Sequence, residues 1–446
     1  MFEYLFNFLY PLLVILNLHL HNFYKHLKPL FSMKGILVVI DGLGDLPNRF
    51  LGDKTPLEAA NTPNMDFLAT RGELGRMDTV KAGYIPGSDE GIVSLFGNDS
   101  SYVSRGVLEA VGAGLKVVRG DLCLRTNFAT INNLKERNII DRRCGRTLTT
   151  HEAEVLSKSL NKINLPCKFD FVQTIQHRGV LVLRGGFSDN ISRNDISYYN
   201  QGKIKEQQKA SMVKPLDDEE NSQYTANVLN EFLNQAFEIL DSHPINEIRR
   251  KKGLMPANFL IFRGPGTEVP KLKLYKEWMA ITYMPLEIGI AKVSGMTPFT
   301  FKYPEMEDFD VYDNLYEGLV KACKFSVKCL KQNYNKYNYA WIHIKETDLP
   351  GHDNKPVEKK NMLEYIDQNL FSFIRKLATK NKIKVAITAD HSTPCSMKTH
   401  SSDPVPVLLY NDSLPREKHF GEKEARLGTL GRVEGKDFLR TVGFVK

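Results

Sequence analysis

Short, uninterrupted apolar runs alternate with longer segments of helical periodicity along most of this chain. Four runs, rich in β-branched and aromatic residues, have the pattern of strands buried on both faces: residues 35–40, 339–344, 385–388 and 405–409. Apolar positions at helical spacing predict a helix across 312–330, and a second helix falls within 358–380. Because strands and helices alternate, we predict an α/β core with a mostly parallel, doubly wound sheet.

The pattern changes from about residue 119. Polar strands are predicted at 122–129 and 139–143, a helix at 151–162, further strands at 169–176, 179–184 and 258–262, and an amphipathic helix at 221–241. The stretch 189–220 is rich in Asn, Ser, Lys and Gln, which predicts a mobile loop. These features predict an α+β domain inserted at 118–290 between two parts of the core, 33–117 and 291–446.

The first 32 residues stand apart from this organisation. Residues 2–20 are mostly apolar, with Glu3 as their only charge, and their length is near the minimum for a membrane span. They lack the basic start and the small-residue cleavage site of a signal peptide. Three interpretations stay open: a membrane anchor, a helix packed on the body, or translated sequence upstream of a functional start at Met33. Membrane contact is expected only if this segment is retained.

Composition narrows the class of protein. Hydrophobic residues make up 42% of the chain and charged residues 25%, which is typical of a globular protein with a substantial core. The net charge of +8 is modest and spread out, and no nucleic-acid-binding motif accompanies it, so it is compatible with a phosphorylated small-molecule substrate and is weak evidence for nucleic acid, which we do not expect as a partner. Six cysteines without CxxC spacing fit a reducing compartment, and we expect a cytoplasmic protein. The sequence does not indicate an oligomeric state.

Metal-binding side chains follow three of the predicted strands. Asp41 comes directly after the first run, and the other candidates follow two later runs: Asp348, His352, Asp390, His391 and His400. Open α/β sheets gather their functional groups at the carboxyl ends of parallel strands. Carboxylates together with imidazoles suit Mn²⁺, Zn²⁺ or Co²⁺, whereas carboxylates alone would favour Mg²⁺. Six such groups are too many for one ion and predict a pair, which can clamp the oxygens of a phosphoryl transfer.

Ser88 is the candidate nucleophile for such a site. It lies in the loop 83–91, at the expected start of a helix around 92–96. Coordination to a metal would favour its alkoxide, and helix N-terminal N–H groups would stabilise a phosphoryl group. A Gly-Ser-Asp turn by itself is most often only a turn, so the inference depends on the three Asp and His motifs that accompany it.

The order of these motifs resembles the alkaline phosphatase superfamily. Within that superfamily the chain is similar to the archaeal-type 2,3-bisphosphoglycerate-independent phosphoglycerate mutases from about Met33 to the end. The similarity is carried by VIDGLGD at 39–45, TPLEAANTPNMD at 55–66, PGSD at 86–89, RTNFAT at 125–130, DRRCGR at 141–146, the stretch 343–353 and HSSDPVPV at 400–407.

The resemblance implies an alkaline phosphatase-like core, an inserted lid domain and an isomerase. It assigns one metal to Asp348, His352 and His400, and the second to Asp41, Ser88, Asp390 and His391. Ser88 would accept the phosphoryl group while 3-phosphoglycerate and 2-phosphoglycerate interconvert in glycolysis and gluconeogenesis, without a bisphosphoglycerate primer. Two divalent cations are expected, Mn²⁺ first, with Mg²⁺, Zn²⁺ and Co²⁺ as alternatives.

A phosphoserine mechanism places two further demands on the chain. The inserted domain must exclude water as a lid, and arginine forks must bind the carboxylate and phosphate of phosphoglycerate. The candidate substrate-binding residues are Arg125, Arg142, Arg143, Arg146, Arg263 and Lys345.

One stretch departs from the family pattern, which usually continues Asp-Thr-Asp-Pro-His where this chain has RNDIS at 193–197. A metal-dependent phosphatase or another phosphotransferase therefore stays an alternative to the mutase. A non-catalytic membrane-attached scaffold, indicated only by residues 2–20, is disfavoured by the intact set of candidate ligands.

Overall fold

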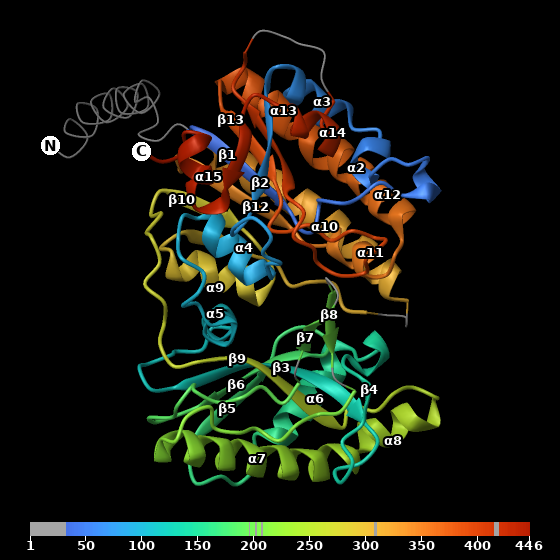
Figure 1. Cartoon of the computed structure of the whole chain (residues 1–446), viewed down its shortest axis with the longest axis vertical. Helices are drawn as coiled ribbons and strands as arrows, with labels where there is room; N and C mark the ends of the chain where they lie inside the picture. The colour runs from blue at the N-terminus through green and yellow to red at the C-terminus, as the bar shows by residue number, and fades with distance from the viewer. Residues whose placement is uncertain (1–32, 196, 201–202, 207, 307–309, 414–418) are drawn as a thin grey trace, which may run out of the picture.

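The chain folds into two lobes, seen one above the other in Figure 1. The structure is a computed structural model that describes residues 33–446 except 196, 201–202, 207, 307–309 and 414–418. The upper lobe contains an eight-stranded sheet, and the lower lobe contains a five-stranded sheet. The apolar segment at 2–20 lies outside the described residues, so the three interpretations of it stay predictions.

The larger sheet is mostly parallel, as predicted, and has the order β11-β10-β12-β1-β13-β14-β2-β15. Its strands are β1 (Gly35–Ile40), β2 (Gly72–Asp78), β10 (Trp278–Ile281), β11 (Thr297–Phe299), β12 (Tyr339–Ile344), β13 (Lys384–Thr388), β14 (Val405–Tyr410) and β15 (Gly431–Glu434). Every residue of β1 and β14 is buried, which explains their continuous apolar runs. Strand β14 runs antiparallel to both of its neighbours, because a loop rather than a crossover helix precedes it.

Helices cover this sheet. They are α2 (Pro56–Ala59), α3 (Pro63–Thr70), α4 (Ser88–Leu95), α9 (Pro285–Val293), α10 (Val311–Asn333), α11 (Asp348–His352), α12 (Pro356–Ile366), α13 (Ser372–Asn381), α14 (Glu422–Arg426) and α15 (Gly435–Thr441). A π-helical turn, η3 (Asp367–Phe371), joins α12 to α13, and a 3₁₀ turn, η1 (Arg49–Leu51), precedes α2. Their apolar faces and the sheet share one core, with the side chains of Val38, Trp341 and Ile387 fully buried.

Strand register explains how distant residues reach one edge of the sheet. Strand β1 pairs in parallel with β12 and β13, with Ile40 opposite Ile344 and Val39 opposite Thr388. The residues that follow these strands therefore leave the sheet side by side. The N–H of Asp41 donates to the carbonyl of Ile344 at 2.9 Å, which extends the ladder to the first residue past β1.

The lower lobe is built on β3 (Leu122–Ile131), β4 (Ile139–Asp141), β5 (Phe169–Gln173), β6 (Arg178–Leu183) and β9 (Phe259–Gly266). All its pairings are antiparallel. A 3₁₀ turn, η2 (Cys144–Arg146), and the helices α6 (Thr150–Leu160), α7 (Glu220–Asp241) and α8 (Pro244–Lys251) complete it. This is an α+β arrangement, and its apolar cluster is distinct from that of the upper lobe.

Two features of this lobe differ from the expectation. The chain rejoins the larger sheet at β10, ahead of the division expected at residue 290, because the short run at β10 pairs in parallel with β12. The stretch 189–220, expected to be a mobile loop, contains an antiparallel pair, β7 (Ser197–Asn200) with β8 (Lys203–Glu206). Short polar strands carry little periodicity, which is why the sequence pattern did not indicate them.

Helix α5 (Arg105–Gly112) lies between the two lobes in Figure 1, next to α9. Backbone hydrogen bonds and apolar packing hold the lobes internally, and each of the six cysteines carries a free thiol. No helix among the described residues has both the length and the apolarity needed to cross a membrane.

Candidate metal centre

The six Asp and His candidates and Ser88 come together at one edge of the larger sheet. Asp41 follows β1, and Asp390 and His391 follow β13 with one residue between the strand and Asp390. Asp41, Asp390 and His391 are fully buried, and Ser88 is 5% exposed. All seven positions were identified in the sequence, and none of them lies elsewhere in the fold.

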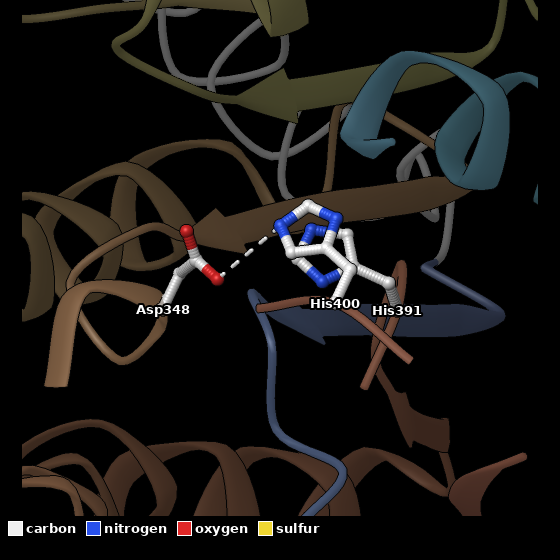
Figure 2. Close-up of side chains that lie close together, drawn as sticks. All are labelled: Asp348, His391 and His400. Carbon is white, nitrogen blue, oxygen red and sulfur yellow. Dashed lines mark ion pairs between the residues drawn. The ribbon is translucent and has the colours of Figure 1, made fainter. Parts of the chain in front are cut away.

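The first group consists of Asp348, His352 and His400. The one-turn helix α11 begins at Asp348 and ends at His352, so the two side chains lie on one face, with His352 Nε2 3.3 Å from Asp348 Oδ2. His400 approaches from the loop after β13, and its Nε2 lies 3.8 Å from Asp348 Oδ1 (Figure 2). The carbonyl of Pro86 lies 2.8 Å from His400 Nδ1, which fixes the orientation of the ring.

The second group consists of Asp41, Ser88, Asp390 and His391. His391 Nε2 lies 3.3 Å from Asp41 Oδ1, 3.4 Å from Asp390 Oδ2 and 3.2 Å from the Ser88 hydroxyl oxygen. The His391 ring stacks on the His400 ring with 3.6 Å between centroids, and the two rings overlap in the view of Figure 2. His391 therefore lies between the two groups, in contact with members of both.

Helix α4 positions Ser88 in this group. Ser88 is the first residue of α4, and Glu90 accepts the N–H of Gly87 at 2.8 Å, which closes the first turn. The helix packs directly on the loop that carries Asp390: a Cβ at Gly91 would lie 2.1 Å from the Asp390 carbonyl oxygen. Glycine at this position therefore lets the Ser88 hydroxyl reach the ligand cluster.

The donor set fits divalent cations. Two clusters, Asp348 with His391 and His400, and Asp41 with His343 and Asp390, each have ligand atoms within 4.8 Å of one another. Asp41 Oδ1 and Asp390 Oδ2 are buried without a hydrogen-bond donor, which is costly unless a cation satisfies them. Burial, reinforced by the Asp390 carboxylate, raises the pKa of Asp41. A bound cation would relieve this repulsion between neighbouring carboxylates.

Imidazoles shape the electrostatics of the first group. Although burial opposes it, His352 holds the pKa of Asp348 well below its usual range. Asp348 in turn raises the pKa of His352. Burial and the neighbouring His391 lower the pKa of His400 to about 3, so its imidazole is neutral at physiological pH. Neutral imidazole is the form that binds a metal.

Lys345, His343 and Glu287 complete the surroundings of the second group. The Lys345 ammonium contacts the Asp41 carboxylate and lies 3.1 Å from the Ser88 hydroxyl oxygen. His343 Nε2 lies 3.8 Å from both Asp41 Oδ2 and Asp390 Oδ2, and its Nδ1 lies 3.6 Å from Glu287 Oε1. Lys345 was a candidate from the sequence, but His343 and Glu287 were not. His343 lies in the matching stretch 343–353 but inside an apolar strand, and Glu287 is a lone acid in a helix, so neither was identified as a site residue.

The candidate arginines lie in the lower lobe, and carboxylates pair with Arg125, Arg142, Arg146 and Arg263. Asp195 is contacted by both Arg142, at 3.1 Å, and Arg263, at 3.0 Å. Arg125 is partly buried on β3 with its Nε 3.3 Å from Glu109 Oε1, and desolvation holds its pKa well below the usual range. These three therefore form an anchored basic cluster rather than a solvated surface.

Arg146 and Arg143 connect that cluster to the metal centre. Arg146 Nη1 donates to both oxygens of Asp353 at 2.9 Å, and Asp353 follows His352 directly. The charge of Arg143 acts to lower the pKa of His352, against the larger effect of Asp348. The departing stretch 193–197 supplies Asp195 and the buried Asn194, whose amide joins Phe262 N–H and Leu260 O. Through Asp195, the described residues of this stretch hold Arg142 and Arg263 in position.

The chain is similar in sequence to known proteins over most of its length. The family model of 2,3-bisphosphoglycerate-independent phosphoglycerate mutase matches residues 69–246. An enzyme of that name from Thermococcus kodakarensis is 41% identical over 91% of this chain and 95% of its own. Its namesake from Pyrococcus furiosus is 40% identical over the same shares.

Two solved structures are also similar to this chain in fold. A protein from Pyrococcus horikoshii superposes with a TM-score of 0.71 at 30% identity, covering 94% of this chain and 99% of that one. A cofactor-independent phosphoglycerate mutase from Thermoplasma acidophilum gives a TM-score of 0.54 at 27% identity, covering 91% and 98%.

Proposed function

The chain belongs to the family of 2,3-bisphosphoglycerate-independent phosphoglycerate mutases, and from this premise we propose that Ser88 carries the phosphoryl group during its reaction. The enzyme is an isomerase that interconverts 3-phosphoglycerate and 2-phosphoglycerate in glycolysis and gluconeogenesis. The observation that supports the role of Ser88 is its position: the hydroxyl oxygen lies 3.2 Å from His391 Nε2 and 3.1 Å from Lys345 Nζ.

The seven candidate side chains would hold two divalent cations. Asp348, His352 and His400 would hold one, and Asp41, Ser88, Asp390 and His391 would hold the other. Bound there, the cations would supply positive charge that favours the Ser88 alkoxide and neutralises phosphoryl oxygens. We propose Mn²⁺ as the physiological ion, because mixed carboxylate and imidazole ligands suit it, and Zn²⁺, Co²⁺ and Mg²⁺ are the alternatives.

The reaction proceeds in two phosphoryl transfers. The Ser88 hydroxyl gives up its proton as its oxygen attacks phosphorus, the serine O–P bond forms, and the bond from phosphorus to the substrate O3 breaks. The departing O3 takes up a proton, and glycerate stays bound. After glycerate reorients, its O2 hydroxyl gives up its proton and attacks the phosphorus of phosphoserine. The O2–P bond forms, the serine O–P bond breaks, and the Ser88 oxygen takes up a proton to restore the hydroxyl. The phosphoryl group that Ser88 takes from 3-phosphoglycerate returns to the same glycerate, so no bisphosphoglycerate primer is required.

The chain's own groups stabilise the charge that moves in these steps. Lys345 places its ammonium beside the Ser88 oxygen, where it stabilises the alkoxide and the phosphoserine. Although burial opposes it, Asp41 raises the pKa of Lys345, so the ammonium stays charged. Ser88 is the first residue of α4, so the helix N-terminus adds N–H groups that favour a bound phosphoryl group.

The lower lobe keeps glycerate in place and water out. Arg125, Arg142, Arg143, Arg146 and Arg263 are proposed to bind the carboxylate and phosphate of the substrate, since guanidinium groups match these planar anions. Glu109 holds Arg125 in position, Asp195 holds Arg142 and Arg263, and Asp353 holds Arg146. Without the lower lobe over the site, water would reach the phosphoserine and the mutase would act as a phosphatase.

An enolase-coupled assay tests this proposal on the full chain with 3-phosphoglycerate, Mn²⁺ and no bisphosphoglycerate, and released phosphate is measured in parallel. Phosphoenolpyruvate formation that a chelator abolishes, with little free phosphate, supports the metal-dependent mutase. Phosphate release that equals or exceeds isomerisation would favour the phosphatase alternative. Cell fractionation tests the proposed cytoplasmic location and any membrane attachment.

A further inference from the structure

A buried threonine links the two ligand groups. Thr393 is fully buried, two residues after His391. Its hydroxyl donates to Asp348 Oδ1 at 2.7 Å, and the same oxygen lies 3.0 Å from His391 Nδ1. Asp348 belongs to the first group and His391 to the second. One hydroxyl therefore contacts a proposed ligand of each cation.

The chemistry of this bridge fixes the tautomer of His391. An ionised carboxylate only accepts hydrogen bonds, so the single hydroxyl proton of Thr393 points to Asp348. The Thr393 oxygen can then only accept from His391, which places the imidazole proton on Nδ1. His391 Nε2 is left with a lone pair, and this is the nitrogen that faces Asp41, Asp390 and Ser88.

The backbone of Thr393 is held on both sides. Its N–H donates to the carbonyl of Gly44 at 2.9 Å, and its carbonyl accepts from Lys359 Nζ at 3.1 Å. Lys359 is fully buried and pairs with Asp45 at 2.7 Å, and Asp45 in turn accepts the N–H of Cys395 at 3.1 Å. A buried ion pair thus anchors the chain before and after Pro394.

The space around the bridge is also limited by backbone. Gly42 has φ +62°, and a Cβ there would lie 2.7 Å from the Thr393 hydroxyl oxygen and 2.8 Å from Asp348 Oδ1. The glycine of the Asp41-Gly42 motif therefore leaves room for the bridge. The hydroxyl fits a position defined by the loop anchors on one side and by Gly42 on the other.

We propose that Thr393 is a positioning residue that orients Asp348 and holds His391 in the Nδ1–H tautomer, so that both ligand groups bind their cations in the correct geometry. This inference rests on the two-metal site proposed above, and it adds a shared support for the two ions. Partners of metal ligands typically change metal affinity about 10–100-fold when they are removed.

The test compares Thr393→Val, which keeps the shape and removes the hydroxyl, with Thr393→Ser, which keeps the hydroxyl. Thr388→Val is the matched control, because Thr388 is also fully buried and its hydroxyl donates to a backbone carbonyl, that of Pro406, at 3.2 Å. Mn²⁺ affinity is measured by calorimetric titration of the full-length metal-free protein. The tautomer is read from ¹⁵N NMR of histidine-labelled protein, with His391→Gln identifying the signal.

Thr393→Val is expected to weaken Mn²⁺ binding roughly tenfold or more and to shift the His391 signals away from the Nδ1–H pattern. Thr393→Ser and Thr388→Val should resemble the wild type in both measurements. Wild-type affinity and tautomer in Thr393→Val would overturn the proposal, as would loss of both in Thr393→Ser at an unchanged melting temperature. Neither readout needs substrate, so a protein that fails the mutase assay can still pass this test.

Discussion

The hydroxyl oxygen of Ser88 lies 3.2 Å from Nε2 of His391, although 303 residues separate them in the chain. Helix α4 brings the first residue and the loop after β13 brings the second. Their contact joins a nucleophile to a cluster of metal-binding groups, and the proposed mechanism depends on it.

Replacement of Ser88 by alanine should abolish isomerisation while metal binding persists. The other candidate ligands stay in place, but no oxygen remains to take the phosphoryl group, so kcat should fall by roughly 10⁴-fold or more. The coupled assay and metal content measure the two effects. Ser94→Ala, at a buried position of the same helix, is the control and should stay active. An active Ser88→Ala enzyme would eliminate the covalent route.

Substitution of His343 by glutamine should weaken the second cation site. His343 supports the Asp41 and Asp390 carboxylates at 3.8 Å and is itself backed by Glu287. We expect Mn²⁺ affinity at one of two sites to fall roughly tenfold, measured by calorimetric titration. His243→Gln, at a histidine that caps α8 in the lower lobe, provides the comparison. Equal affinity at both sites in His343→Gln and wild type would show that His343 does not support a ligand.

Asp353→Asn should raise the fraction of turnovers that release phosphate. Asp353 ties Arg146 of the lower lobe to the end of α11 and also accepts from the Tyr312 hydroxyl at 3.0 Å. Loss of this ion pair would hold the lower lobe less firmly over the site and admit water. An ion pair worth about 1 kcal/mol corresponds to a rise of about fivefold in the ratio of phosphate release to isomerisation. Parallel phosphate and coupled assays give the ratio. Asp412→Asn removes a surface pair with Arg71, within the upper lobe, and should leave the ratio unchanged.

Glu422→Gln should change how stability depends on pH. Burial raises the pKa of Glu422 from 4.5 to about 7, even though it accepts from Thr55 and from the N–H of Asp45. Between these values the folded protein holds a proton that the unfolded chain has lost, so this group stabilises less as pH rises through that window. Urea unfolding at pH 5 and pH 7.5 should show a smaller loss for Glu422→Gln than for wild type. Identical losses would contradict the assignment, and Glu268→Gln, at an exposed carboxylate, serves as control.

The sequence was most informative where chemistry follows strands directly. Asp41 and Asp390 could be placed at one edge because continuous apolar runs precede them and parallel strands end together. The spacing of Asp348 and His352 fits one helical turn, and α11 provides it. Ser88 at the start of α4 followed from a glycine-rich loop before a helix.

The features that the sequence did not indicate depend on the directions of side chains and on the order of the strands. Thr393 contacts Asp348, and Glu287 contacts His343, across long stretches of the chain, and no local spacing marks such contacts. The antiparallel direction of β14 is set by a loop whose length resembles that of other connections. Asp195 was part of the departing stretch that raised the phosphatase alternative, yet it holds Arg142 and Arg263. The role of a charged residue such as Asp195 can therefore be inferred only once the structure shows its partners.

Trapping the covalent intermediate tests the central claim most directly. The full-length Mn²⁺-loaded enzyme is mixed with 3-phosphoglycerate, quenched in acid during steady-state turnover, digested and analysed by tandem mass spectrometry. Phosphate on Ser88, absent without substrate and absent from the Ser88→Ala protein, is the predicted result. Steady isomerisation with Ser88 unmodified, or with phosphate on another residue, would contradict the account.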